Sequence, residues 1–130
     1  MADMLPRLFF VHFRETSFVV EQDGTRVAFL VGFVSQTYPT QAYIHFVGVH
    51  PDYRKQGIGE RLYTRFFETV KTRGCDEVHC VTSPVNKGSI AFHTRMGFEA
   101  EAGDTGVDGI PVKLDYDGEG QGRVVFVKKL

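Results

Sequence analysis

The sequence predicts an α/β (α+β) fold with a central mixed sheet that is mostly antiparallel. Two β-rich runs flank Asp23-Gly24, a dipeptide that favours a tight hairpin turn, so they indicate an antiparallel pair. A strand, a helix and another strand then follow one another between residues 42 and 83, which indicates a parallel β–α–β pair with a right-handed crossover. A last β-rich run at residues 123–130 completes one domain over residues 1–130.

Composition excludes several classes of protein. A net charge of −1 gives no general attraction to nucleic acid or to an anionic membrane surface. No apolar run approaches the ~20 residues that a membrane-spanning helix needs, and the N-terminal MADMLPRLFF does not resemble a signal peptide. Cys75, His79 and Cys80 fit no zinc spacing. We therefore expect reduced thiols, no metal and a cytoplasmic location.

The first elements follow from hydrophobic periodicity. Apolar residues and one histidine recur at helical spacing in residues 4–14, which predicts a short amphipathic helix with its apolar face in the core: Leu5, Leu8, Phe9, His12 and Phe13. Strands are predicted over residues 17–22, 25–35 and 42–49. Gly48, inside the third strand, indicates a bulge or a close backbone approach.

The second half of the chain continues the pattern. After Gly59 a helix is predicted with one buried stripe, formed by Ile58, Leu62, Phe66 and Val70, and Gly74 suits its C-terminal end. A fourth strand is predicted over residues 77–83. A second helix within residues 84–97 is predicted to end at Gly97 with Phe98 as its hydrophobic contact. Residues 99–122 form a Gly-rich loop whose seven carboxylates are opposed only by Lys113.

One loop carries the strongest chemical signal. Residues 54–59, RKQGIG, run from the end of a strand directly into a helix, whose first turn has unpaired N–H groups and the positive end of the helix dipole. Gly57 and Gly59 permit positive φ and leave room for a close-approaching phosphate, while Arg54 and Lys55 add positive charge. The sequence therefore predicts a phosphate site; the alternative is a surface turn without a ligand.

This stretch, VHPDYRKQGIG, resembles motif A of the GNAT superfamily of acyl-CoA-dependent N-acyltransferases, R/Q-x-x-G-x-G/A. Residues 86–98, NKGSIAFHTRMGF, resemble the family's motif B. The resemblance covers residues 17–100 most firmly and implies the GNAT fold, whose parallel pair is splayed to hold CoA. The family usually has a strand and two helices before the hairpin, so the N-terminus looks shortened. Neither a P-loop motif nor a Rossmann motif is present.

The resemblance also implies which residues bind acetyl-CoA. The pyrophosphate is expected on the loop from Arg54 to Glu60, and the pantetheine arm along the third strand, whose backbone N–H groups would polarise the thioester. Asn86 is expected at the pantetheine or at a bridging water, although its position equally suits a helix N-cap. The expected cofactor residues are Val47, Gly48, Val49, Arg54, Lys55, Gln56, Gly57, Ile58, Gly59, Glu60, Asn86 and Ser89.

Two histidines are the candidate catalytic residues. His93 stands where the family often has a tyrosine that protonates the departing CoA thiolate; the alternative is a packing histidine. The family's usual glutamate base on the third strand is absent, so His45 is the best substitute, acting directly or through water. Strand alternation predicts Tyr43, His45 and Val47 on the acceptor face and Ile44 and Phe46 on the face under a helix. His50, at the end of this strand, is expected to support the residues that contact the substrate without contacting the substrate itself.

The resulting hypothesis is an N-acetyltransferase that transfers the acetyl group of acetyl-CoA to a primary amine by direct attack in a ternary complex. The acceptor is a small-molecule or peptide amine. The resemblance implies that the acidic stretch 99–122 borders the acceptor groove, where it would attract a cationic amine; the alternative is a solvated loop with no part in binding. The short N-terminus and the 12 phenylalanines favour a homodimer. The alternatives are a catalytically degenerate acyl-CoA-binding sensor or interaction module, and a plain nucleotide-binding module.

Overall fold

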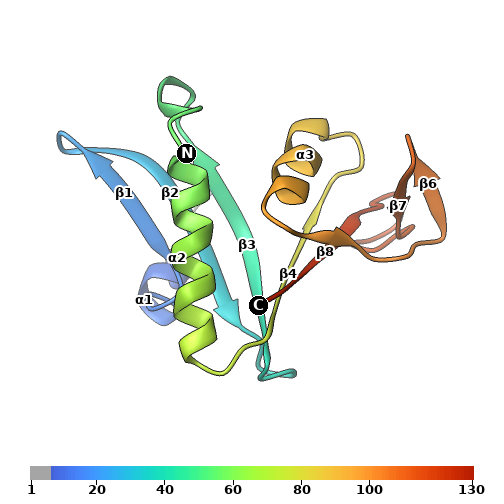
Figure 1. The fold of residues 1–130 in the computed structure, drawn as a ribbon, viewed down its shortest axis with the longest axis horizontal. Helices are drawn as coiled ribbons and strands as arrows, with labels where there is room; N and C mark the ends of the chain where they lie inside the picture. Colours follow the sequence, from blue (N-terminus) through green and yellow to red (C-terminus); the bar gives the residue numbers. More distant parts are fainter. Residues whose placement is uncertain (1–6) are drawn as a thin grey trace. The chain divides into compact units, whose positions relative to one another are not determined.

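The computed structural model describes residues 7–130 and has the predicted α/β class (Figure 1). Three strands follow the first helix, four more follow the last one, and the sheet is mixed and includes a parallel pair. Contacts divide the chain into two compact units, one up to Asp76 with Leu130 added, the other from Glu77 to Lys129. Each unit contains one of the two motifs identified in the sequence.

The first unit is an antiparallel three-stranded arrangement with helices. Its elements are α1 (Leu8–His12), β1 (Phe18–Gln22), β2 (Thr25–Val34), β3 (Gln41–Val49), a short 3-10 helix η2 (Pro51–Tyr53) and α2 (Ile58–Thr72). β2 pairs antiparallel with both β1 and β3. Asp23 and Gly24 both have positive φ, 52° and 78°, as a tight hairpin turn requires. The predicted hairpin is therefore confirmed.

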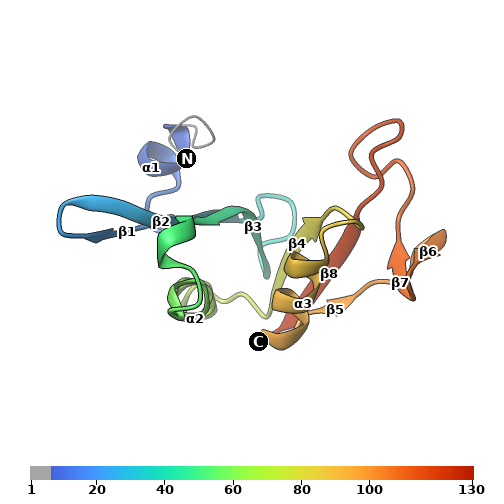
Figure 2. The ribbon, with the colours of Figure 1, turned by 90° about the horizontal axis from the view of Figure 1, so that it is seen from above.

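The two faces of this three-stranded sheet are covered by different helices. Figure 2 shows α1 on one side of β1–β3 and α2 on the other. α2 buries the predicted stripe together with one further aromatic residue: Ile58, Leu62, Tyr63, Phe66 and Val70. Gly74 follows the helix with a φ of 90°, as predicted. On the opposite side, Phe9 of α1 packs with Phe29 and Val31 of β2.

α1 is shorter than predicted and buries less. The helix spans only Leu8–His12 of the predicted 4–14, and the predicted core residue Leu5 lies outside the described residues. Phe9 is buried, but Leu8 is 47% exposed, so the prediction of one fully buried apolar face is wrong. A helix of little more than one turn presents too narrow a face to bury every apolar residue along it.

A bulge in β3 overturns the predicted assignment of its faces. Val31 pairs with Phe46 and the next residue, Gly32, pairs with Ile44, so His45 is an extra residue on β3. Ile44 and Phe46 therefore face opposite sides: Phe46 packs against the cluster at α1, together with Phe29. Strict alternation was the wrong assumption, because one inserted residue reverses the facing of everything beyond it.

Gly48 is the point of close approach that the sequence indicated. A Cβ atom at this position would lie 2.5 Å from the Phe29 ring, which no real Cβ atom tolerates. The ring lies over the glycine because Gly48 and Phe29 are paired across the two strands. The predicted close approach is therefore confirmed, while the bulge is three residues earlier, at His45.

The second unit contains the remaining elements. They are β4 (Glu77–Thr82), α3 (Lys87–Arg95), β5 (Glu99–Ala100), β6 (Thr105–Val107), β7 (Ile110–Val112) and β8 (Val124–Lys129). β8 pairs antiparallel with β4 and with β5. α3 ends as predicted: Gly97 has a φ of 93°, and the N–H of Phe98 donates to the carbonyl of His93 at 3.0 Å.

The stretch predicted as a Gly-rich loop contains a hairpin that the sequence analysis missed. β6 and β7 pair antiparallel around Asp108-Gly109, whose φ angles of 50° and 83° match those of the first hairpin turn. The dipeptide is the same Asp-Gly signal, but its flanking strands, TGV and IPV, are only three residues each. Short strands of this kind give too little period-2 alternation to be recognised.

Candidate functional site

The loop between β3 and α2 contains most of the predicted phosphate-binding residues. Gly57 is the N-cap of α2 with a left-handed φ of 76°, and its carbonyl accepts the first helical hydrogen bond, from the N–H of Arg61 at 3.1 Å. No side chain caps this helix end. The N–H groups of the first turn have no acceptors within a helix, and Gly57 has no side chain that could accept from them.

The space in front of this helix end suits an anion. A Cβ atom added at Gly57 would meet nothing within 4 Å, so a ligand atom can approach the backbone there. Gly57 adopts the positive φ expected of it, whereas Gly59 has helical conformation in the first turn of α2. An unblocked, uncapped N-terminus of a fifteen-residue helix matches the chemistry of a phosphate group.

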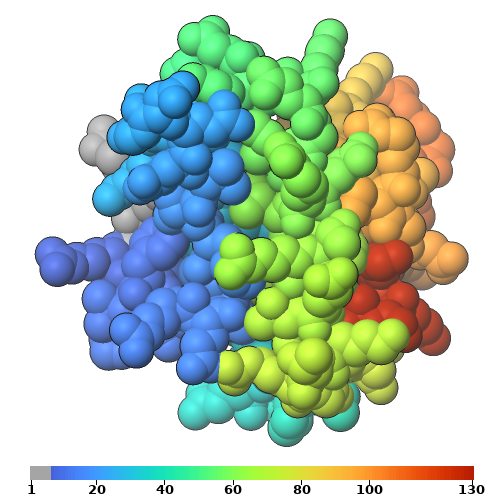
Figure 3. Space-filling model, turned by 60° about the vertical axis from the view of Figure 1, so that its left-hand side comes forward, coloured from blue at the N-terminus to red at the C-terminus, as the bar shows by residue number. Residues whose placement is uncertain are grey.

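An open hollow of about 530 Å³ lies beside the loop on the first unit. Figure 3 shows this side of α2 next to the β1–β2 hairpin. Predicted loop residues and polar side chains along the outer face of α2 line the hollow: Gln56, Gly57, Glu60, Arg61, Thr64, Arg65 and Glu68. Three of the predicted cofactor residues therefore meet at one depression, which also carries charges of both signs.

The two basic residues of the loop are held differently. Arg54 donates from Nε to the carbonyl of Val49 at 3.2 Å, so its guanidinium is tied to the end of β3. Lys55 is exposed and has a left-handed φ of 65°, which is unusual for a residue with a side chain. The loop therefore concentrates two positive charges between β3 and Gly57, as expected.

The predicted acceptor-face residues of β3 are stacked on the α1 side. The His45 ring stacks on Phe9 at a centroid distance of 5.1 Å, and Tyr43 stacks on Phe33 at 5.5 Å. His45 is nevertheless exposed at its bulge. Val47 pairs with Leu30 one position beyond Phe46, so it faces the α2 side, and its predicted place beside Tyr43 is wrong. The role of His45 as a base stays a prediction.

Motif B forms a helix start with a clear structural role. Asn86 is the N-cap of α3, and its Oδ1 accepts the N–H of Ser89 at 3.1 Å. This is the capping role that the sequence analysis gave as an alternative, and it does not exclude contact with a ligand. Ser89 in turn contacts His93, with its Oγ 3.2 Å and its carbonyl oxygen 2.7 Å from Nδ1.

His93 is a buried residue in an aromatic cluster. It is only 6% exposed, its ring stacks on Phe126 at 5.3 Å, and it meets Phe98 edge-on at 5.2 Å. The carbonyl of Ser89 only accepts, so Nδ1 carries the hydrogen in that bond. Burial lowers the pKa of His93, partly opposed by this hydrogen bond. The packing role is therefore present, and the acid role stays a prediction.

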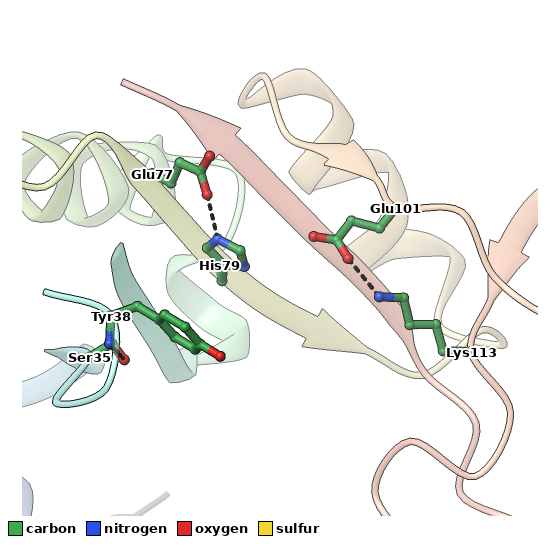
Figure 4. A network of polar contacts seen from close by, with 6 residues as sticks. All are labelled: Ser35, Tyr38, Glu77, His79, Glu101 and Lys113. Carbon is green, nitrogen blue, oxygen red and sulfur yellow. Dashed lines mark hydrogen bonds and ion pairs between the residues drawn. The ribbon is translucent and has the colours of Figure 1, made fainter. Parts of the chain in front are cut away.

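Two polar pairs in the second unit were missed by the sequence analysis (Figure 4). His79 Nε2 lies 2.9 Å from Glu77 Oε1, and Lys113 Nζ lies 2.6 Å from Glu101 Oε2. The Glu77–His79 pair had a signal, because residues two apart on a strand share a face. Both side chains of that pair are partly buried, which orients the imidazole.

The acidic stretch is more neutralised than its sequence indicated. Lys87 lies 3.6 Å from Asp108, and Arg123 lies 2.9 Å from Asp117, so Lys113 is not the only opposing cation. Asp115 also has a local role, accepting the N–H of Gly120 at 2.8 Å. Lys87 and Arg123 were not predicted as partners because they lie outside residues 99–122.

Other candidate chemistry is limited. Cys75 and Cys80 are buried free thiols, and burial raises the pKa of Cys80 to about 12, which makes it a poor nucleophile. Within residues 7–130, no three His, Cys, Asp or Glu side chains form a group that could hold a metal ion. The helices of the same part of the chain include none long and apolar enough to span a membrane.

Comparison with known proteins gives one family. Residues 2–98 match the model of the acetyltransferase (GNAT) family. An uncharacterized N-acetyltransferase of Methanocaldococcus jannaschii is 37% identical over 86 residues, which cover 63% of this chain and 38% of that protein. L-2,4-diaminobutyric acid acetyltransferase of Nocardia farcinica is 32% identical over 80 residues, covering 62% and 42% respectively. The match thus spans less than half the length of these two relatives.

Solved structures share the fold. Ard1 from Thermoplasma volcanium has a TM-score of 0.77 at 20% identity, covering 94% of this chain and 75% of that one. Arabidopsis thaliana Naa50, in complex with the bisubstrate analogue CoA-Ac-MVNAL, has a TM-score of 0.71 at 20% identity, covering 89% and 74%. These likenesses confirm the fold predicted from the two motifs.

Proposed function

The chain belongs to the acetyltransferase (GNAT) family, and from that membership we propose that it transfers the acetyl group of acetyl-CoA to a primary amine. The observation that carries this proposal is the uncapped N-terminus of α2 at Gly57, with open space in front of it. The N–H groups there would bind the pyrophosphate of CoA. Residues 1–130 would act as one catalytic domain.

The proposed reaction is a direct attack in a ternary complex: the amine nitrogen would bond to the acetyl carbonyl carbon, the C–S bond would break, and CoA would leave as its thiolate. Acetyl-CoA supplies an activated thioester carbonyl. The backbone N–H groups of Val47, Gly48 and Val49 would polarise that carbonyl, and His45 would accept the proton of the amine, directly or through water. His93 would contact the sulfur end of acetyl-CoA. Its ring would be mainly neutral there, because burial lowers the pKa of His93. Asn86 and Ser89 would contact the pantetheine arm.

The acceptor is proposed only as a class. One relative is named as an acetyltransferase of L-2,4-diaminobutyric acid, and one fold neighbour was solved with a CoA–peptide analogue. Both point to primary amines, either a small diamine or a peptide N-terminus. We further propose a homodimer and a cytoplasmic location, the latter supported by two free thiols. Light scattering at micromolar concentration should give the mass of a dimer.

A sensor that binds acyl-CoA without turnover is the second candidate. Two observations favour it: the third strand has no glutamate base, and burial disfavours the charged form of His93. A screen separates the two candidates. Purified protein is mixed with acetyl-CoA and with 2,4-diaminobutyrate, spermidine or short peptides, and CoA thiol release is followed. Release that depends on an amine supports the enzyme; CoA binding without release supports the sensor.

The loop itself is tested by calorimetry with CoA. Gly57→Glu should weaken CoA binding at least tenfold, about 1.4 kcal/mol, because a carboxylate would occupy the phosphate position. The matched control is Gly24→Glu, at a glycine with nearly the same φ, 78°, and equally open surroundings. Unchanged affinity in a folded Gly57→Glu protein would reject the site.

A further inference from the structure

His50 makes three hydrogen bonds at the end of β3. Its N–H donates to the carbonyl of Val27 at 2.7 Å, which anchors it to β2. Its carbonyl accepts the N–H of Tyr53 at 2.8 Å, and its Nδ1 accepts the N–H of Asp52 at 3.1 Å. His50 is thus the N-cap of η2 and acts with its side chain as well as its backbone.

This capped turn leads directly into the phosphate loop. The last hydrogen bond of η2 runs from the N–H of Arg54 to the carbonyl of Pro51 at 3.4 Å, and the same arginine is tied to Val49 through Nε. Gly57 follows three residues later. The path of the chain from β3 to the helix N-terminus therefore depends on the turn that His50 caps.

The side-chain bond exists only while the imidazole is neutral. Nδ1 must offer a lone pair to the N–H of Asp52, and protonation would place a second donor against it. The Asp52 carboxylate lies 3.8 Å from Nδ1 and would attract the imidazolium away from the backbone. The other charged or titratable groups in the turn are Tyr53, whose ring meets His50 edge-on at 5.8 Å, and Arg54.

We propose that His50 is a positioning residue for acyl-CoA: its neutral side chain holds the η2 turn, and its protonation weakens binding at the phosphate loop. The inference rests on the proposed function, because it assumes that CoA binds there. It predicts tighter CoA binding when the imidazole is neutral and weaker binding when it is protonated. If His50 only stabilised the turn, replacing it would change the free energy of unfolding and leave CoA affinity unchanged.

The test is calorimetry with CoA at pH 8, 7 and 6 and constant ionic strength, on three proteins. His50→Asn keeps a side-chain acceptor at the N-cap but cannot be protonated, whereas His50→Ala removes the acceptor. The CoA phosphates also titrate, and the Asn variant corrects for this. We expect the wild-type Kd, divided by that of His50→Asn, to rise threefold or more from pH 8 to pH 6. His50→Ala should bind several-fold more weakly than wild type at pH 8.

Controls keep the outcomes separate. His12→Asn, an exposed histidine in α1, should follow the wild-type pH dependence. The backbone amide signal of Asp52 in NMR spectra should move with pH in the wild type and not in His50→Asn, whether or not a variant binds CoA. A constant Kd ratio across pH, or wild-type affinity in folded His50→Ala, overturns the inference alone. Wild-type protein that does not bind CoA at pH 8 overturns both it and the proposed function.

Discussion

His93 shows how burial changes what a motif residue can do. Its place in motif B is read directly from the sequence, but its stacking partner, Phe126, lies on β8, far away in the chain. No local pattern predicts such a contact, so the lowered pKa could not be foreseen. Gly57 is the opposite case, because its conformation is fixed by the local turn and helix start that the sequence already displays.

The lowered pKa of His93 makes a prediction about acid stability. The folded chain keeps this group neutral at pH values where the unfolded chain, with a pKa near ~6.5, takes up a proton. His93 therefore contributes stability above that value, and the contribution is lost as pH falls toward the folded pKa. Between pH 7 and pH 5, the melting temperature of wild type should fall more than that of His93→Phe, which keeps the stacked ring. Parallel curves would contradict this.

β3 is the element for which the sequence led to the most predictions about both the fold and the site. Its bounds, Gln41–Val49, agree with the predicted 42–49 to one residue. The bulge at His45 was not predictable, because it depends on how β2 pairs with β3 and not on the β3 sequence alone. The β6–β7 hairpin was missed for a related reason: its stability comes from pairing between segments too short to show a pattern.

The covering of Gly48 by Phe29 can be measured. Gly48→Ala should reduce the free energy of unfolding by roughly 1–3 kcal/mol, because the new methyl group overlaps the ring. Gly48→Ala combined with Phe29→Leu should recover part of this loss. Gly106→Ala in β6, where the methyl group would have an ordinary 3.6 Å contact, is the control for glycine loss in a strand. The free energies of unfolding are measured by urea denaturation. Equal losses in Gly48→Ala and Gly106→Ala would refute the steric account.

The two roles of Asn86 can be separated at the start of α3. Asn86→Ala should cost about 1 kcal/mol of stability through the lost cap. Asn86→Asp keeps an acceptor at the same place and should keep most of the stability. If Asn86 also contacts pantetheine, Asn86→Asp should still weaken CoA binding in calorimetry. Equal CoA affinity in wild type and Asn86→Asp would leave the cap as its role.

For the whole molecule, the attraction of a charged ligand depends more on how charges are distributed than on the net charge. The negative charge of the acidic stretch follows from its sequence, whereas its partial neutralisation by Lys87 and Arg123 depends on folding. If the carboxylates of this stretch attract a cationic acceptor, kcat/KM should fall as ionic strength rises, since exposed charges are screened over ~10 Å at 0.1 M.

The matching variant replaces Asp115, Asp117 and Glu119 with Asn, Asn and Gln. It should raise KM for a cationic amine and flatten the salt dependence, while CoA affinity stays unchanged. A neutral amine measured beside it is the internal control. If the variant handles both amines as wild type does, the stretch has no part in choosing the acceptor.

The extra residue on β3 also bears on how this strand tolerates changes in chain length. Ile44 and Phe46 already pair with consecutive residues of β2, so deleting His45 would join them into a regular ladder without moving either partner. A one-residue deletion at Ile44 would instead remove a buried residue. Lineages of this chain should therefore be able to lose the codon for residue 45 and keep the strand. Near-wild-type melting of the His45 deletion, set against loss of folding on deletion of Ile44, would show it.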